Sequence, residues 1–104
     1  MQPIRRYTLL SLLAAFFSLP LLAGCAGMPL QQMSDARQAV RAAERAGAEQ
    51  YAPELLDEAR ALVKAASENL HQGEYRDARD EAELAREKAM EARRISEEAK
   101  GARP

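Results

Sequence analysis

The chain has 104 residues, of which 15 are Lys or Arg and 16 are Asp or Glu, giving a formal net charge of −1. This length leaves room for one small domain besides any leader. Nearly balanced charge argues against a nucleic-acid-binding surface, which needs an excess of Lys and Arg. The single cysteine excludes a disulfide within the chain.

Residues 1–24 have the organisation of a secretion signal. Arg5 and Arg6 form a positive end, a mostly apolar run follows from Thr8 to Leu19, and Pro20 interrupts it. A membrane-spanning helix needs about 20 apolar residues, and this run is shorter. We therefore predict a helical signal peptide over 1–24. A permanent transmembrane anchor and an ordinary secretory leader are the alternatives.

The signal ends in Leu22-Ala23-Gly24-Cys25, which resembles the lipobox of bacterial prolipoproteins. The resemblance implies cleavage between Gly24 and Cys25. It also implies an S-diacylglycerol on the Cys25 thiol and an N-acyl chain such as palmitate on its amine. Cys25 would then hold the mature protein on a membrane. Ala26 stands where the inner-membrane retention signal of enteric lipoproteins has Asp. We therefore expect a location at the periplasmic face of the outer membrane, with the inner membrane as the alternative.

After a short linker over residues 25–31, the rest of the chain, 32–104, reads as one helical domain. Small and apolar residues recur at alternating spacings of three and four, which is the helical period. The first such stripe contains Met33, Ala36, Val40, Ala43 and Gly47, and the second contains Ala52, Leu56, Ala59, Val63, Ala66 and Leu70. They predict helices over about 32–48 and 53–72.

Glycine and proline mark the ends of these helices. Gly47 weakens the first helix, and Pro53 fits the first position of the second, so we predict a break around Glu49 to Ala52. Gly73 is expected to close the second helix as a left-handed cap.

The third stripe is the most regular and predicts a helix over about 74–100. Its members are Tyr75, Ala78, Ala82, Ala85, Ala89, Ala92, Ser96 and Ala99. From Cys25 onward, 19 of 80 residues are alanine. Alanine favours helices and lets their backbones approach closely, so we predict an all-α fold. The expected architecture is a small, coiled-coil-like, antiparallel bundle of three helices.

Charged residues also follow helical spacing. One basic row is Arg37, Arg41 and Arg45, a second is Arg79, Arg86, Arg93 and Lys100, and an acidic row is Glu83, Glu87 and Glu91. We expect these rows to pair across helices and keep the domain soluble. The alternative is a basic surface for an acidic partner or for lipid headgroups.

Three large apolar residues of the third helix, Leu84, Met90 and Ile95, fall outside its alanine stripe. Such residues need a partner or another helix to cover them. We predict an interaction surface here for another envelope protein or a second copy. The competing interpretation is that the first helix covers these residues within the monomer.

The residues from about Ala36 to Arg94 resemble the alanine-rich domain of unknown function 4398. The resemblance is carried by Ala46-Gly47-Ala48, Tyr51-Ala52-Pro53-Glu54, Gly73, Tyr75, Ala78-Arg79, Ala82 and Ala85. It implies an envelope lipoprotein. A weaker similarity to a tetratricopeptide hairpin rests on Gly73-Glu74-Tyr75, Ala78 and Ala82 and adds support for a pair of helices.

No residue pattern indicates catalysis. His71 is the only histidine and has no neighbouring serine, and Asp77, Asp80 and Glu81 read as a solvated helix start rather than as metal ligands. We predict no cofactor, metal, small-molecule substrate or nucleic-acid partner.

The predicted function is therefore that of a non-enzymatic envelope lipoprotein, acting as a helical adaptor or structural protein facing the periplasm. The alternative is a cell-wall tether like the trimeric alanine-zipper lipoprotein of the outer membrane. A tether of that kind expects an unbroken helix, and Gly47, Pro53 and Gly73 disfavour one.

Overall fold

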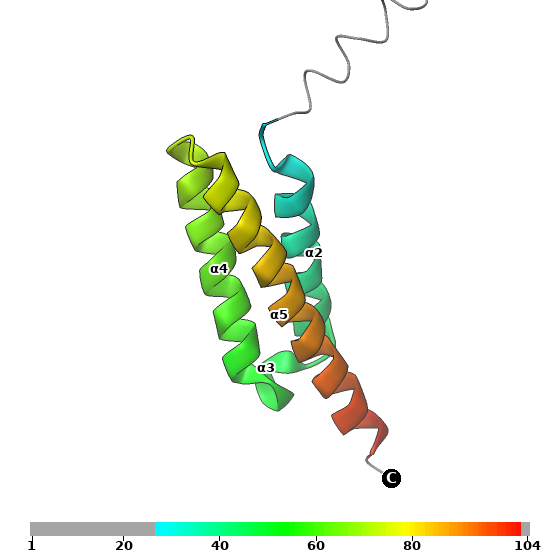
Figure 1. The fold of residues 1–104 in the computed structure, drawn as a ribbon. Coiled ribbons are helices and arrows are strands. Elements are labelled where there is room, and N and C mark those ends of the chain that lie inside the picture. The colour runs from blue at the N-terminus through cyan, green and yellow to red at the C-terminus, as the bar shows by residue number, and fades with distance from the viewer. Residues whose placement is uncertain (1–26, 103–104) are drawn as a thin grey trace, which may run out of the picture.

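The computed structural model describes residues 27–102, which form four α-helices and no strand. They are α2 (Leu30–Arg45), α3 (Ala48–Tyr51), α4 (Pro53–His71) and α5 (Tyr75–Gly101). The three long helices run side by side, with α4 antiparallel to α2 and α5 (Figure 1). The predicted all-α bundle is confirmed. The signal peptide, its cleavage point and Cys25 lie outside the described residues.

The first helix starts two residues earlier than the sequence indicates. Pro29 precedes α2, and its carbonyl accepts the first helical hydrogen bond from the Met33 amide at 3.0 Å. Pro29 is itself fully buried. Packing of this proline therefore fixes where the chain joins the bundle. The spacing of apolar residues in the sequence does not reveal this contact, so the predicted start came two residues late.

The predicted break at Glu49 to Ala52 is wrong, because most of this segment is helical. The turn falls at Gly47, whose φ of +92° is a left-handed conformation that glycine adopts easily. Its amide donates to the Glu44 carbonyl at 3.0 Å and ends α2. One turn of helix, α3, follows, and Ala52 then leads into α4 with Pro53 at its start.

Gly73 caps α4 as predicted, with a φ of +78°. The Gly73 amide donates to the Leu70 carbonyl at 3.2 Å, and the Glu74 amide donates to the Asn69 carbonyl at 2.8 Å. These two bonds form a Schellman motif, which satisfies carbonyls at the helix end. The motif reverses the chain within three residues, so α5 can pack along the full length of α4.

The core is formed chiefly by small side chains. Helix α5 buries every third or fourth residue along one face, here called the alanine seam: Ala78, Ala82, Ala85, Ala89, Ala92 and Ser96. Tyr75 and Ala99, at the ends of the predicted stripe, are exposed and half-buried. The Ser96 hydroxyl donates to the Ala92 carbonyl at 2.7 Å, so no polar atom is left unsatisfied there.

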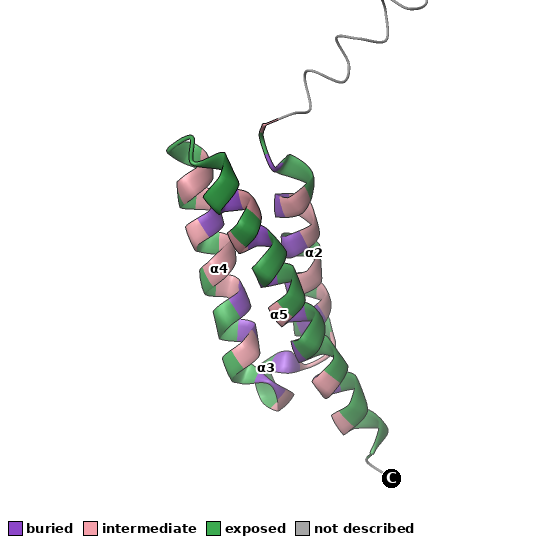
Figure 2. Cartoon of the chain, viewed as in Figure 1, coloured by how far each residue is buried: buried purple, intermediate pink, exposed green. Residues whose placement is uncertain are grey.

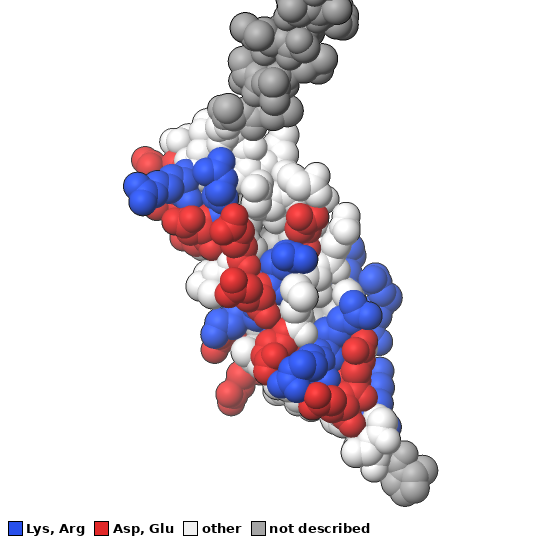
Figure 3. Space-filling model, turned by 45° about the vertical axis from the view of Figure 1, so that its right-hand side comes forward, with Lys and Arg blue, Asp and Glu red and all other residues white. Residues whose placement is uncertain are grey.

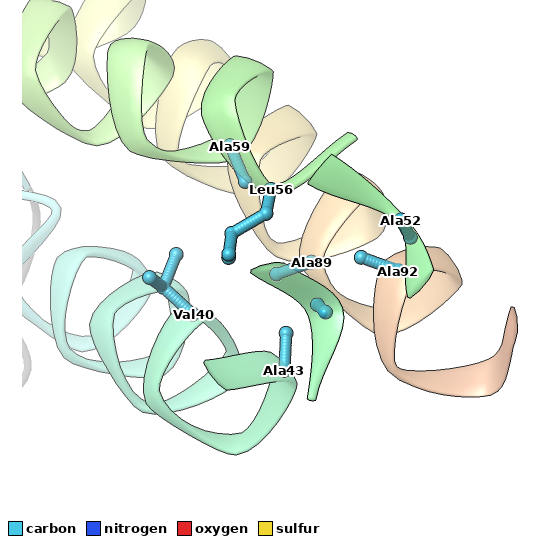
Figure 4. Packing of buried hydrophobic residues seen from close by; sticks show 8 residues of the cluster. Val40, Ala43, Ala52, Leu56, Ala59, Ala89 and Ala92 are labelled. Carbon is cyan, nitrogen blue, oxygen red and sulfur yellow. The ribbon is translucent and has the colours of Figure 1, made fainter. Parts of the chain in front are cut away.

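Helices α2 and α4 both pack on the alanine seam, and the buried residues line their facing sides (Figure 2). The cluster next to α3 joins all four helices and centres on Leu56, which points toward Val40 across the cluster (Figure 4). The other cluster, next to the α4–α5 turn, is built around Met33. Met33 and Leu56 are the largest fully buried side chains. Because each alanine methyl contributes under about 1 kcal/mol, close backbone approach matters more here than side-chain bulk.

We predict that Ala82→Leu or Ala85→Leu lowers the free energy of unfolding by about 1–3 kcal/mol, because extra methyl groups overfill a closely packed site. Both alanines are fully buried between helices. The matched control is Glu87→Leu on the exposed side of α5, which should change stability little. Urea unfolding followed by circular dichroism measures all three. Equal losses at the three positions would show that the alanine seam is not tightly packed.

Candidate functional site

The predicted interaction residues of α5 do not form one surface. At about 100° per residue, Ile95 lies ~20° from Leu84 around the helix, whereas Met90 lies ~120° away on the other side. Lys88, ~20–40° from both Ile95 and Leu84, contacts Glu58 of α4, so these two residues lie on the side of α5 nearer α4. Met90 lines a hollow with residues of α2 and lies on the other side. Counting this angle from the sequence could have separated Met90 from the other two.

Ile95 is partly buried and packs against the core cluster around Leu56, whereas Leu84 and Met90 are 41% and 50% exposed. For Ile95 the competing interpretation, coverage within the monomer, is the one the structure bears out. The cluster that Ile95 packs against contains Leu56 and Ala59 of α4 as well as Val40 and Ala43 of α2, so the first helix is not the only one that contributes. Of the predicted surface, only Leu84 and Met90 remain open to a partner.

Met90 lines a groove between α2 and α5 of about 400 Å³. Its walls contain Asp35, Gln38, Ala39, Ala42 and Arg45 from α2 and Arg86, Met90 and Arg93 from α5. A second hollow of about 300 Å³ shares Asp35 and Arg86 and continues it along the bundle. We call the first of these the α2–α5 groove. It combines an apolar floor of Ala39, Ala42 and Met90 with three arginines.

Ion pairs between helices use residues outside the predicted rows. Arg60 of α4 contacts Glu44 of α2 at 3.5 Å and Glu49 of α3 at 2.8 Å. Lys88 of α5 contacts Glu58 of α4 at 3.2 Å. The hydrogen bond from Arg60 to Glu49 is the largest cause of a raised pKa at Arg60. These pairs are exposed, so solvent screening keeps their contribution to stability small.

Arg60 also contacts Asp57 within α4 at 3.5 Å, and the other ion pairs of the described residues lie along α5 itself. Arg94 donates to Glu91 and Glu98, and Arg93 pairs with Glu97 at 2.8 Å. The hydrogen bond from Arg94 lowers the pKa of Glu91. A lowered folded-state pKa stabilises the fold above the unfolded-state value and loses that effect as pH falls. Solvent screening keeps the effect small at these exposed positions.

The expectation that the charged rows pair across helices is therefore wrong. Within the described residues, no ion pair involves Arg37, Arg41, Arg45, Arg86, Lys100, Glu83 or Glu87. Figure 3 shows basic and acidic side chains interspersed along this face of the bundle, from its upper to its lower end. The reason is geometric, because Arg37 and Arg41 flank a second groove between α2 and α4, and the acidic row lies on the outward side of α5. Arg37 and Arg41 therefore lie away from the acidic row, whereas Arg86 lines the same hollow as Glu83 and Glu87 of its own helix.

Of the acidic residues near the start of α5, Asp77 and Asp80 are exposed, and Glu81 has a structural contact. Glu81 accepts a hydrogen bond from the Asn69 side chain at 2.8 Å and links α5 to α4. His71 is exposed in the last turn of α4. Residues 27–102 hold no group of three or more His, Cys, Asp or Glu side chains arranged to bind a metal ion. Nor is any helix in that range long and apolar enough to cross a membrane.

Fold and surface together define a small, alanine-rich helical bundle with a cationic groove. The family model of a domain of unknown function, DUF4398, matches residues 31–103, and the chain belongs to that family. The family resemblance seen in the sequence is thus confirmed. No curated protein and no solved structure matches the chain.

We predict that Ile95→Ser and Leu84→Ser have different effects on stability. Ile95→Ser removes an apolar side chain from contact with the core and should cost about 1–3 kcal/mol. Leu84→Ser replaces a side chain that is 41% exposed and should leave the melting temperature within a few degrees of wild type. Thermal unfolding of the two single variants is the measurement. A larger loss for Leu84→Ser than for Ile95→Ser would contradict the assignment of the two residues.

Proposed function

We propose that the protein is a non-enzymatic, lipid-anchored adaptor of the bacterial cell envelope. The observation that carries the proposal is the Leu22-Ala23-Gly24-Cys25 motif, placed only a few residues before the helical bundle. Three acyl chains on Cys25 would exceed the roughly two hydrophobic signals that stable anchoring needs. Ala26 favours the periplasmic face of the outer membrane as the location. The lipid supplies the membrane attachment, and the bundle supplies the surface for a protein partner.

An adaptor accounts for the fold better than the tether of the trimeric alanine-zipper type. That tether needs one long helix whose alanine stripe faces other copies. Here the chain reverses at Gly47 and Gly73, and α2 and α4 occupy the alanine seam of α5. The alanine seam is therefore buried within one chain. Contacts with other proteins would use the exposed sides of the bundle.

The α2–α5 groove is the surface that fits the adaptor role. Arg45 and Arg86 have no ion pair among the described residues, and Met90 between them is half-exposed. A groove between two parallel helices accommodates a third helix, with apolar side chains on the floor and opposite charges at the rim. The partner that this arrangement favours is an acidic, amphipathic helix of another envelope protein.

Lipid attachment is tested by Cys25→Ser. The variant should lose acyl-chain labelling completely and accumulate as the uncleaved precursor, because the modified cysteine is the substrate for the dedicated peptidase. Met28→Ser, three residues beyond the motif, is the matched control and should be labelled and processed normally. Metabolic labelling with a clickable fatty acid, followed by membrane fractionation, gives the result. Normal labelling of Cys25→Ser would refute the anchor and the location with it.

The groove is tested by photo-crosslinking in intact envelopes. A benzoyl-phenylalanine at Met90 should crosslink to a protein partner, whereas the same probe at Leu84 should not, although both positions are about equally exposed. Adding Arg45→Glu and Arg86→Glu should abolish the Met90 crosslink without lowering the melting temperature, because both arginines lie on the surface.

Identifying the crosslinked peptide by mass spectrometry completes the test. An acidic helical segment of a second protein supports the adaptor. Crosslinking to a second copy of this chain would replace the adaptor by self-association. Equal crosslinking from Met90 and Leu84 would reject the groove.

A further inference from the structure

Exposed apolar side chains gather at one end of the bundle. Five large apolar residues are exposed within residues 27–102, and three of them, Met28, Leu30 and Tyr75, lie at the end where the chain joins the bundle. That end consists of the start of α2 and the turn between α4 and α5 (Figure 1). Single exposed apolar residues are ordinary, whereas their concentration at one end points to a contact.

Buried Pro29 keeps Met28 and Leu30 at the surface. Pro29 is fully buried between them, so the bundle holds this segment while 51% of Met28 and 59% of Leu30 remain exposed. The segment is also tied to α5, because the Arg79 guanidinium donates to the Gly27 carbonyl at 3.4 Å. The two apolar side chains are therefore presented by a packed part of the fold and not by a free tail.

The sequence around this segment is free of charge. No residue between Arg6 and Asp35 is acidic or basic. In Figure 3 the described surface beside the point where the chain joins the bundle is correspondingly white, whereas several basic and acidic side chains gather at the turn between α4 and α5. Burying this surface against an apolar phase would cost no desolvation of charge on the α2 side.

We propose that this end of the bundle, formed by Met28, Leu30 and Tyr75, sits in the lipid headgroup layer of the membrane that carries Cys25. The inference rests on the proposed lipid anchor. Met28 is the third residue after Cys25, so the two are at most about 11 Å apart. The headgroup layer of one leaflet is roughly 5–8 Å thick. Even a fully extended link passes the headgroup layer by only about 3–6 Å. An acylated Cys25 would therefore hold the bundle against the membrane surface, and the first side chains that the bundle presents there are apolar.

The chemistry of the three side chains fits this layer. Tyrosine concentrates at membrane interfaces, where its ring meets the apolar boundary and its hydroxyl remains hydrated. Leu30 and Met28 gain free energy from burial of apolar surface. Arg76 and Arg79 stand beside Glu74, Asp77 and Asp80 in the same part of the chain, so the local charge is mixed and slightly negative. A slightly negative surface gains nothing from an anionic lipid, so the expected partner is a zwitterionic headgroup layer. The attraction then comes from the three apolar side chains.

The protein contains no tryptophan, so a single tryptophan reports on one position. The experiment uses the full lipidated chain, purified from envelopes and reconstituted in vesicles of phosphatidylcholine and phosphatidylethanolamine. Leu30→Trp and Tyr75→Trp are the probes, and Met90→Trp, midway along α5, is the matched control. Lipids brominated near the headgroup end of their acyl chains quench tryptophan that lies at the interface.

Both probes are expected to shift to shorter wavelength and lose fluorescence in brominated vesicles, while Met90→Trp is unaffected. Unchanged quenching at high salt is also expected, because the contact does not depend on charge. Vesicle flotation separates failure of this inference from failure of the anchor. Chains that do not float lack the lipid and refute the proposed function.

Floating chains whose Leu30→Trp and Tyr75→Trp stay as unquenched as Met90→Trp would overturn the inference and leave the anchor intact. Quenching at Leu30→Trp alone would overturn it as well. In that case proximity to Cys25, and not seating of the whole end of the bundle, explains the signal.

Discussion

Close approach of helix backbones at the alanine seam is the constraint on which the rest of the structure depends. A methyl group extends little beyond the helix surface, so α2 and α4 can both lie against one face of α5. Each methyl contributes little apolar area, and the stability comes from many short contacts summed along 27 residues of α5. A larger residue in the seam would push a neighbouring helix away over several turns.

The turns follow from the same constraint. For α4 to reverse and lie along α5, the chain must turn within three residues, and Gly73 in a left-handed conformation permits this. The reversal between α2 and α4 is longer, and the single turn of α3 fills it. Ala48 of α3 and Ala52 after it are buried in the cluster around Leu56, so α3 closes that end of the core. At the opposite end, around Pro29 and Met33, no helix among residues 27–102 plays this part, and Met28, Leu30 and Tyr75 are exposed.

Because the two ends of the bundle differ, the proposed anchor implies one orientation of the bundle on the membrane. The open, apolar end is the one closest in sequence to Cys25, and the charged rows and the α2–α5 groove lie along the sides of the bundle. A protein anchored in this way would present Arg45, Arg86 and Met90 sideways to a neighbour on the same membrane. The proposed anchor, the lipid-facing end and the docking groove are thus compatible in one orientation.

The sequence by itself determined the helical fold, most of the buried faces and the cap at Gly73, because these depend on local spacing and on the φ preference of glycine. It also supplied the family membership and the Cys25 motif. It did not determine the place of Ile95, the turn at Gly47 or the partners of the charged rows. Those depend on the angle at which each side chain leaves its helix relative to two neighbouring helices. That angle is fixed only when α2 and α4 have both packed on the alanine seam, and only then are Ile95 covered and Met90 left in an open groove.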